Sequence, residues 1–400
     1  MNKIIFHVDV NSAYLSWEAI YHKQELGVDY DLREEVAVVG GDIKKRHGVV
    51  LAKSDKAKEY GIITGESIVS AIRKYPDLRV VKPHYEMYAM CSEKLMNMLK
   101  EYTPVVEQYS IDEAYMDMTG TQGIHGDLVQ LAYKIKDRIY KELMFTVNVG
   151  ISSNKLLAKM AGELKKPNMV HTLYEHEIKD KMWPLPVGKL FFVGNASEKR
   201  LKLLGVHTIG ELANSDKKLI ELHLKKQGSI IHNYANGIDS SGVKGVRHSN
   251  KGYGNSITLP EDIYTEEAAN LILLSLCETV GSRLRVAKAK ANCISVSMVD
   301  SIFEKKSHQI TLTHSTCSTN QIYVNACKIF DEMWDGKTKI RQLGVHTTKL
   351  DDEHVHQCSL FDTEENKKKD KLDTAIDKIR DRYGDKSIIR ASLVRYNKKD

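Results

Sequence analysis

Three carboxylates at the ends of short strand-like runs are the residues of this sequence best suited to chemistry. Asp9 ends the first such run, and the adjacent acids Asp112 and Glu113 lie between the runs 105–110 and 114–118. Neighbouring side chains on a regular strand point to opposite faces, so both acids reach one site only if the chain turns there. The β-forming residues on either side predict a hairpin tip. Hard oxygen ligands of this kind suit Mg²⁺ bound together with substrate phosphates.

The elements that must position these acids alternate between strands and helices. The predicted strands are 4–10, 36–40, 49–52, 105–110, 114–118 and 146–151. The predicted helices are 12–23, with Ser12 as its N-cap, then 84–100, 128–143 and 153–165. This is an α+β pattern in which most neighbouring strands are antiparallel.

The strand signal disappears in the next part of the chain. Short helices at 196–204, 209–213, 217–224 and 229–236 predict an all-α module. The polar, basic and glycine-containing stretch 240–252 is interpreted as a linker between domains. A second α+β block runs from 255 to about 350, with a helix at 266–287 before a strand at 293–299, and a densely charged tail follows.

Composition bounds the class of protein. The 400 residues are 42% hydrophobic and 28% charged, which predicts about two to four domains with a substantial core. A net charge of +6 is only mildly basic, so local clusters of charge matter more than the total. The six cysteines show neither CxxC nor zinc-ligand spacing, which is typical of unpaired thiols in a reducing compartment. No signal peptide or membrane-spanning run is evident, so we expect a soluble cytoplasmic protein with no membrane partner.

Several motifs resemble the Y-family translesion DNA polymerases, in the DNA polymerase IV and UmuC-like bacterial branch. They are Asp9 with Tyr14 five residues later, the string Ser-Ile-Asp-Glu-Ala-Tyr at 110–115, and the string Gly-Ile-Ser-Ser-Asn-Lys-Leu-Leu-Ala-Lys at 150–159. The resemblance runs from the N-terminus to about Leu350. It implies template-directed, low-fidelity addition of deoxynucleotides to a primer on template DNA, without proofreading.

The resemblance also implies an α+β multidomain fold shaped like a right hand. The expected parts are a ferredoxin-like palm (1–10 and 76–168), small fingers (11–75), a helix-hairpin-helix thumb (169–239), a linker (240–252), an α+β little finger (253–350) and a charged tail (351–400). We expect the chain to act as a monomer.

The family resemblance gives roles to the residues of the reaction centre. Asp9, Asp112 and Glu113 would be catalytic and would hold two Mg²⁺ ions, or Mn²⁺ in their place, with the carbonyl oxygen of Val10 as a further ligand. Tyr14 matches the steric gate that excludes a sugar 2′-hydroxyl. The plainer interpretations are surface acids for the carboxylates and an ordinary half-buried aromatic for the tyrosine.

Four lysines are candidates for the triphosphate of the incoming nucleotide. Lys166 precedes a proline, as in the family's Lys-Pro motif, and Lys159 lies on the predicted helix 153–165 just before it. In the fingers, the run 51–58 follows a UmuC-like pattern and offers Lys53 and Lys58. A lysine is a compact charge well suited to a phosphate tail, although a solvated helix face is the commoner role of a lysine-rich helix.

Further basic residues are candidates for DNA phosphates, without reading of base sequence. The segment 192–201 resembles a helix-hairpin-helix motif in which Gly194 is kept and Phe192 replaces the first glycine. The other candidates are Lys244, Arg247 and Lys251 of the linker and Arg283, Arg285, Lys288 and Lys290 of the little finger. Solvated surface charge is the alternative for each of them.

The charged tail carries a pentapeptide that resembles the bacterial sliding-clamp motif. Gln357 would bind at the rim of an apolar pocket, and Leu360 and Phe361 would fill it. Two other functions stay open at this point. One is a catalytically silent paralogue that acts as a DNA-binding and clamp-binding adaptor, and the other is a palm-domain nucleotidyl cyclase.

Overall fold

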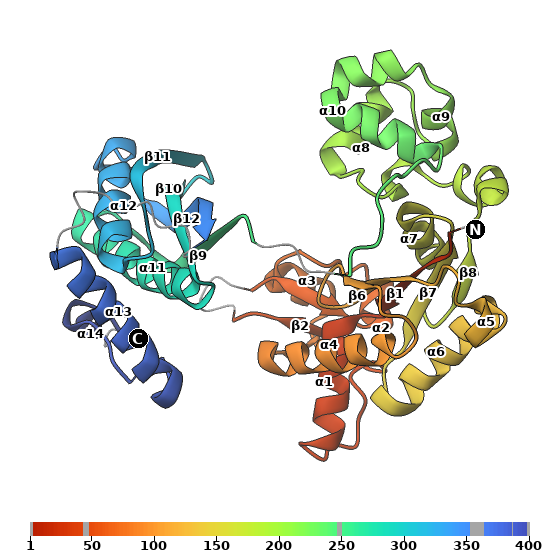
Figure 1. The fold of residues 1–400 in the computed structure, drawn as a ribbon, viewed down its shortest axis with the longest axis horizontal. Coiled ribbons are helices and arrows are strands. Elements are labelled where there is room, and N and C mark those ends of the chain that lie inside the picture. The colour runs from red at the N-terminus through yellow and green to blue at the C-terminus, as the bar shows by residue number, and fades with distance from the viewer. Residues whose placement is uncertain (1–2, 43–47, 246–249, 353–363, 386, 398–400) are drawn as a thin grey trace. The chain divides into compact units, whose positions relative to one another are not determined.

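The computed structural model describes residues 3–42, 48–245, 250–352, 364–385 and 387–397 (Figure 1). Contacts divide the chain into two compact units. The first comprises 1–41 and 48–247, and the second comprises 42–47 and 248–400. No helix in the described ranges is long and apolar enough to cross a membrane.

A five-stranded sheet forms the centre of the first unit. Its strand order is β5-β6-β1-β7-β8, and all neighbours are antiparallel except β7 and β8. The strands are β1 (Ile5–Val10), β5 (Val106–Gln108), β6 (Glu113–Asp117), β7 (Val147–Ser152) and β8 (Val170–Thr172). The three predicted strands 4–10, 114–118 and 146–151 are confirmed to within one residue at each end.

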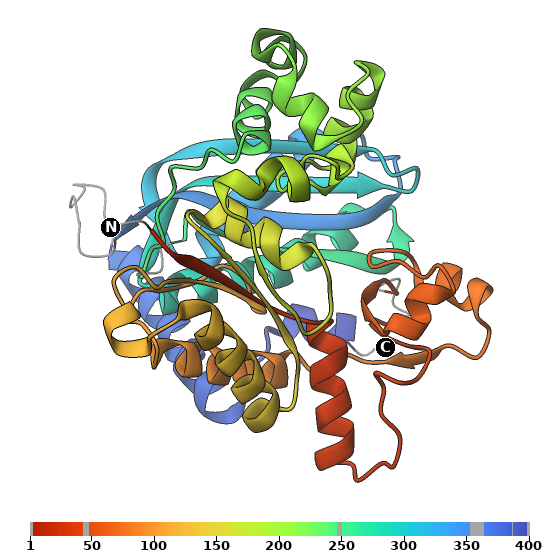
Figure 2. The ribbon, with the colours of Figure 1, turned by 90° about the vertical axis from the view of Figure 1, so that its right-hand side faces the viewer.

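The two faces of this sheet are covered by different helices, as Figures 1 and 2 show. Phe6, Val8 and Val10 of β1 belong to a core shared with α4 (Tyr85–Lys100) and α6 (Leu128–Leu143). The opposite face of β1 and β7 packs against α7 (Lys155–Glu163). Because side chains alternate along a strand, Asp9 lies on the α7 side.

Close packing of α7 on the sheet depends on Gly150. A Cβ atom at Gly150 would lie 1.9 Å from the carbonyl oxygen of Ala158, a distance that no real Cβ contact allows. The missing side chain therefore lets the helix approach the strand backbone. This approach sets how far the lysines of α7 reach along the sheet.

A smaller mixed sheet, β3-β2-β4, lies in the same unit. It is formed by β2 (Ala37–Gly40), β3 (Val50–Lys53) and β4 (Arg79–Val81), with α1 (Ala13–Gln24), α2 (Asp55–Glu59) and α3 (Ile68–Lys74) around it. The prediction that Ser12 caps α1 is wrong. Ser12 has a left-handed backbone (φ 46°) and makes no side-chain cap, because the chain turns sharply between β1 and the helix.

The all-α module follows β8 (Figure 1). Its helices are α8 (Asn195–Leu203), α9 (Ile209–Asn214) and α10 (Lys217–Ala235), preceded by short helical turns at Glu175–Glu177, Ile178–Met182 and Val187–Lys189. The two helices predicted at 217–224 and 229–236 form one element with a break at Lys225, whose φ is +52°. Buried leucines and isoleucines such as Leu201, Leu212 and Ile220 form the core of this module.

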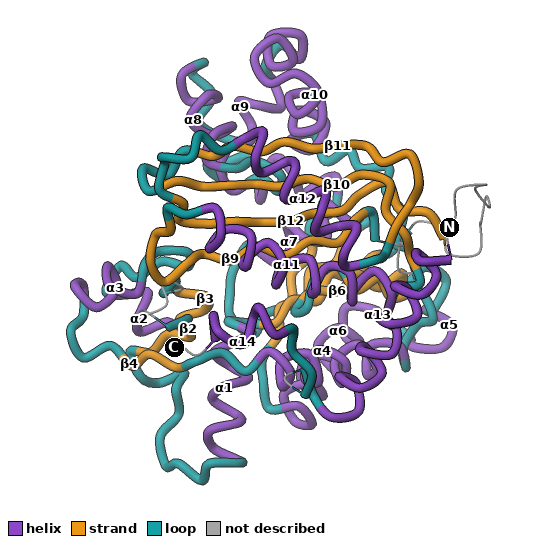
Figure 3. Tube along the Cα trace, turned by 90° about the vertical axis from the view of Figure 1, so that its left-hand side faces the viewer, coloured by secondary structure: helices purple, strands orange, loops and turns teal. Residues whose placement is uncertain are grey.

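The second unit contains a four-stranded antiparallel sheet in the order β11-β10-β12-β9 (Figure 3). The strands are β9 (Gly252–Ile263), β10 (Ala289–Asp300), β11 (Lys305–Thr316) and β12 (Ile340–Asp352), and the helices α11 (Glu266–Val286) and α12 (Thr319–Met333) pack on one face. The expected α+β block from 255 to about 350 is therefore confirmed.

The charged tail folds back onto α11 of this second unit. It forms α13 (Glu364–Tyr383) and α14 (Ala391–Asn397), and both contact α11. The Glu278 carboxylate accepts hydrogen bonds from Arg380 at 3.1 Å and Arg390 at 2.8 Å. The C-terminal helices are thus part of the folded unit.

Arg285 provides the second attachment of the tail. Its Nε lies 2.5 Å from Asp377, its Nη1 lies 3.4 Å from Asp373, and only 11% of its side chain is exposed. The carbonyl of Cys317 accepts a further hydrogen bond from Nη1 at 2.9 Å. The assignment of Arg285 to DNA is therefore withdrawn, because its guanidinium is already held by two carboxylates and a carbonyl. The acids that hold it lie about 90 residues away in the sequence.

We predict that Arg285→Ala lowers the free energy of unfolding of the second unit by about 3 kcal/mol, because it leaves the buried carboxylate of Asp377 without its cation and removes one of the two cations beside the buried Asp373. Arg283→Ala, on the same helix, is the matched control. Arg283 is exposed and donates one hydrogen bond to the carbonyl of Gly254, so its loss should cost only about 1 kcal/mol. Urea denaturation measures both, and equal losses would contradict the structural role of Arg285.

Candidate active site

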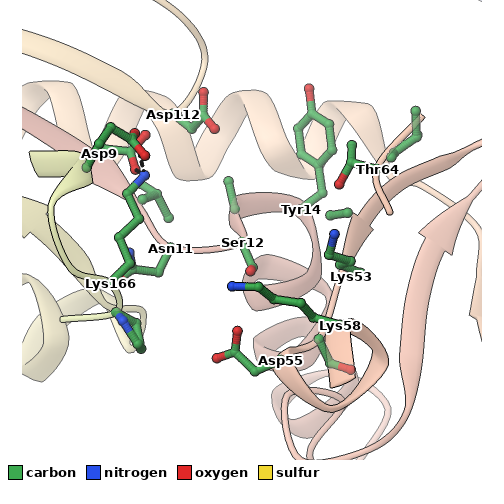
Figure 4. Close-up of a pocket in the computed structure, with 17 residues that line it drawn as sticks. Asp9, Asn11, Ser12, Tyr14, Lys53, Asp55, Lys58, Thr64, Asp112 and Lys166 are labelled. Atoms are coloured by element: carbon green, nitrogen blue, oxygen red, sulfur yellow. Dashed lines mark hydrogen bonds and ion pairs between the residues drawn. The ribbon is translucent and has the colours of Figure 1, made fainter. Parts of the chain in front are cut away.

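A cavity of about 590 Å³ lies in the first unit, between the end of β1 and the segment β3–α2. Figure 4 shows Asp9, Asp112 and Lys166 on one side of it and Lys53, Lys58, Asp55 and Thr64 on the other. The other lining residues are Val10, Asn11, Ser12, Ala13, Tyr14, Leu51, Ala52, Ser54, Glu163 and Pro167. The site therefore joins acids from the end of β1 and the turn before β6 to lysines from β3 and α2.

Strand register and a turn bring the three predicted acids together. Asp9 of β1 is paired directly with Glu113 of β6, so the two side chains start from the same face of the sheet. Residues 110–112 form a turn before β6, and the carbonyl of Asp112 accepts a hydrogen bond from the N–H of Val10 at 3.0 Å. The predicted turn at the Asp-Glu pair is thus confirmed.

The Asp9 carboxylate is buried and faces a lysine. Lys166 Nζ lies 2.6 Å from Asp9 Oδ2 and 2.7 Å from Glu163 Oε1. Burial nevertheless raises the pKa of Asp9 to about 6, because one ammonium group does not fully replace the lost hydration. Burial opposes the charge of Lys166 as well, but the two carboxylates outweigh it and keep its pKa above the usual value.

Glu113 is turned toward α7 rather than into the cavity. Its Oε2 lies 2.6 Å from Lys159 Nζ and 3.4 Å from Nε2 of the buried His7. Burial acts to raise the pKa of Glu113, but His7 and Lys159 outweigh it and lower the pKa to about 2. The pKa of His7 is lowered, chiefly by burial.

The position of Lys159 does not suit the predicted contact with a nucleotide. Lys159 does not line the cavity, and only 11% of its side chain is exposed. Its ammonium lies over the rings of Tyr109 at 5.5 Å and Phe191 at 5.3 Å. We therefore correct the nucleotide assignment of Lys159, whose observed partner is Glu113.

The acids as they stand do not form a closed metal site. Among the described residues, no three His, Cys, Asp or Glu side chains are gathered as metal ligands. The three side chains nevertheless suit a hard divalent ion. Asp9, Asp112 and Glu113 all carry carboxylate oxygens, and they project from one strand end and the turn beside it. Lysine ammonium groups at 2.6 Å from Asp9 and from Glu113 also show that this place attracts positive charge.

The opposite wall is basic. Lys53 and Lys58 both line the cavity, and the pKa of Lys53 is lowered first by burial and then by the charge of Lys58. Two neighbouring ammonium groups form a region that favours an anion such as a phosphate chain. Sequence reasoning missed Thr64 and Ser54 as lining residues, since hydroxyl residues carry no distinctive spacing there.

A buried amide pair supports the loop that carries Lys166. Asn11 donates to Asn148 at 3.1 Å, and Asn148 in turn donates to the carbonyls of Gly162 at 3.0 Å and Lys165 at 2.7 Å. These hydrogen bonds fix the end of α7 against the sheet. Sequence reasoning missed this pair, because two asparagines 137 residues apart leave no recognisable motif.

Tyr14 lines the cavity at the start of α1 (Figure 4). Its ring is half-buried and stacks on the ring of Tyr88, with centroids 4.6 Å apart and planes inclined by 14°. The ring of Tyr85 meets it edge-on at 6.4 Å. The ring of Tyr14 therefore borders the cavity and is backed by two further tyrosine rings.

Two of the residues predicted to contact DNA, Gly194 and Lys244, lie in the described part of the first unit. Gly194 is the N-cap residue of α8 and has no atom near its missing Cβ, so the backbone there is open to a ligand. Phe192 adopts a left-handed φ of +76°, so the hairpin keeps a conformation typical of the lost glycine. The backbone N–H of Lys244 donates to Glu107 at 2.7 Å, which attaches the start of the linker to the sheet.

Four of the remaining predicted DNA contacts lie in the second unit. Lys251, Arg283 and Lys288 are exposed, and Lys290 is half-buried on β10. Arg247 and the predicted clamp peptide, with Gln357, Leu360 and Phe361, lie outside the described residues.

Comparisons with known proteins agree with these features. The impB/mucB/samB family model matches residues 8–163, and the model of the impB/mucB/samB family C-terminal domain matches residues 250–360. The chain is 48% identical over 400 residues to DNA polymerase IV of Clostridium acetobutylicum, with full coverage of both chains. It is 35% identical over 398 residues to DNA polymerase IV 2 of Bacillus subtilis, covering 98% of this chain and 94% of that one.

A solved structure extends the likeness to the fold. A Y-family DNA polymerase chimera superposes with a TM-score of 0.76 at 22% identity, covering 87% of this chain and 99% of the chimera. The α+β right-hand fold expected from the sequence is thereby confirmed. With both family models matched and 48% identity to a relative along the full length, the chain belongs to the impB/mucB/samB family, the Y-family of DNA polymerases.

Proposed function

We propose that this protein is a DNA-directed DNA polymerase that copies damaged templates with low fidelity and without proofreading. The observation that carries the proposal is the cavity in which Asp9 and Asp112 face Lys53 and Lys58, with Glu113 paired to Asp9 across the strands. Its substrates are a primer-template DNA and deoxynucleoside triphosphates. The silent adaptor is not proposed, because the three acids are retained, and family membership leaves no reason to propose a cyclase.

Divalent metal ions are the cofactors used by Y-family polymerases, and we propose two Mg²⁺ for this chain, with Mn²⁺ as a substitute. Asp9, Asp112 and Glu113 would hold them, together with the carbonyl oxygen of Val10. Such ions lower the pKa of a primer 3′-hydroxyl and neutralise the departing pyrophosphate. For Glu113 to take part, its carboxylate has to turn from Lys159 toward the cavity.

We propose that the triphosphate of the nucleotide binds to the basic wall of the cavity. Lys53 and Lys58 lie on it, and Lys166 lies beside Asp9 at its edge. In binding a phosphate, Lys166 would exchange its carboxylate partner for another anion. Tyr14 would lie under the sugar and exclude a 2′-hydroxyl by its bulk.

Contacts with DNA are proposed for residues outside the cavity. The amides at Gly194 and the side chains of Lys251, Arg283 and Lys288 would bind phosphates, as would Lys244, Arg247 and Lys290. We also propose that residues 357–361 bind a sliding clamp and that the protein acts as a cytoplasmic monomer. The support is the peptide sequence itself and the bacterial origin of the relatives.

The acids are tested by single substitutions. Asp112→Ala or Glu113→Ala should lower primer extension by at least ~100-fold, because the variants lose charge stabilisation of the reacting phosphate. Binding to primer-template DNA, measured by fluorescence anisotropy, should stay near that of the parent. Asp55→Ala is the matched control, since Asp55 lines the same cavity on the opposite wall. Full activity in either acid variant would refute the metal assignment.

The sugar gate is tested by Tyr14→Ala. Removing the ring should lower the preference for deoxynucleotides over ribonucleotides by about 100-fold, because the clash with the 2′-hydroxyl is lost. The measurement is kcat/KM for each nucleotide opposite the same template base. Tyr85→Ala, which removes an exposed neighbouring ring, should keep the preference. An unchanged preference in Tyr14→Ala would mean that Tyr14 is no gate.

The clamp peptide is tested by replacing Leu360 and Phe361 with alanine. Synthesis stimulated by a bacterial sliding clamp should fall, and clamp-independent synthesis should be spared, because the two side chains would fill a pocket on the clamp. Leu372→Ala, at an exposed leucine of α13, is the control. Equal loss of both kinds of synthesis would point to a folding role for the peptide.

A further inference from the structure

Glu18 is a fully buried carboxylate to which the proposed reaction gives no role. It lies on α1 four residues after Tyr14, which places both side chains on one face of the helix, and its relative exposure is 0%. A carboxylate stays in such a place only where hydrogen bonds replace its water. Its environment therefore has to supply several donors.

The first turn of α4 supplies those donors. His84, the N-cap residue of α4, donates its backbone N–H to Glu18 Oε1 at 3.1 Å, and its Nδ1 lies 3.0 Å from both carboxylate oxygens. The hydroxyl of Tyr88 donates to the same Oε1. From α1 itself, Nε2 of His22 approaches Oε2 at 3.8 Å. Glu18 thus joins two helices that contact each other in the first unit (Figure 1).

Tyr88 connects this carboxylate to the cavity wall. Its ring is 0% exposed, packs against Trp17 at 5.7 Å and stacks on Tyr14 at 4.6 Å. Burial and the hydrogen bond to Glu18 both raise the pKa of Tyr88, so its hydroxyl stays a donor. The ring is therefore fixed at its hydroxyl end by Glu18 and along its body by Trp17, and one of its faces supports the ring of Tyr14.

We propose that Glu18 is a positioning residue for sugar discrimination, acting through Tyr88 to hold the ring of Tyr14 against the cavity. The inference rests on the proposed function of Tyr14 as a gate. A side chain excludes a hydroxyl group by its bulk only if it cannot move aside. A displacement of the ring by about 1 Å is enough to open space for the hydroxyl. The ring of Tyr14 is only half-buried, so it needs the support of Tyr88.

The test compares the preference for deoxynucleotides over ribonucleotides in four variants. Tyr88→Phe removes the hydroxyl and keeps the stacked ring, and Glu18→Ala removes the carboxylate. Both should lower the ratio of kcat/KM for the two nucleotides by roughly tenfold. Glu18→Gln keeps an oxygen acceptor for Tyr88 and His84, so it should restore most of the ratio. Glu25→Gln, at an exposed residue just after α1, should behave like the parent.

The ratio separates positioning from simple stability. A merely structural role would lower the melting temperature and the activity on both nucleotides together, and would leave their ratio unchanged. Because Tyr88→Phe keeps the ring, it tests the proposal even if Glu18→Ala fails to fold. Parent-like ratios in Tyr88→Phe and in folded Glu18→Ala, beside a lowered ratio in Tyr14→Ala, would overturn the proposal and leave the gate intact. A parent-like ratio in Tyr14→Ala would refute the gate itself, and this inference with it.

Discussion

The antiparallel pairing of β1 with β6 is the constraint on which the rest of the site depends. It places Asp9 directly opposite Glu113, and the turn before β6 brings Asp112 to the same strand end, where its carbonyl is bound by the Val10 N–H. A shift of the register by one residue would send Glu113 to the opposite face of the sheet. The apolar residues Phe6, Val8 and Val10 prevent that shift, because their face packs on α4 and α6.

The same alternation decides which cations meet the acids. Asp9 and Glu113 lie on the face of β1 and β6 that α7 covers, and Gly150 lets this helix approach closely. Lys159 of α7 and Lys166 just beyond it therefore reach the carboxylates and balance their charge when no metal is bound. Burial still raises the pKa of Asp9, so Lys166 does not fully replace the hydration that this carboxylate has lost.

The right-hand fold follows from the resemblance of the motifs to a known family. Local patterns in the sequence predict strands such as β1, β6 and β7 and the turn at Asp112, but they do not predict β4, β8, β9, β11 or β12. They could not predict contacts between distant segments. The sequence makes Arg285 a candidate for DNA, yet acids about 90 residues further on hold it. It makes Lys159 a candidate for the nucleotide, yet Lys159 binds Glu113. The hydrogen bond between Asn11 and Asn148 and the one from His84 of α4 to Glu18 likewise join residues far apart in the sequence, so no local pattern predicts them.

The central claim is that the acids at the β1–β6 strand end take up divalent ions. The most direct measurement is Mn²⁺ binding, followed by electron paramagnetic resonance, with DNA whose primer lacks a 3′-hydroxyl and with a matching deoxynucleotide. The parent should bind Mn²⁺ at least ~10-fold more tightly than Asp9→Asn, since the loss of a charged carboxylate weakens a site of hard oxygen donors. Equal binding by the two proteins would contradict this account of the site.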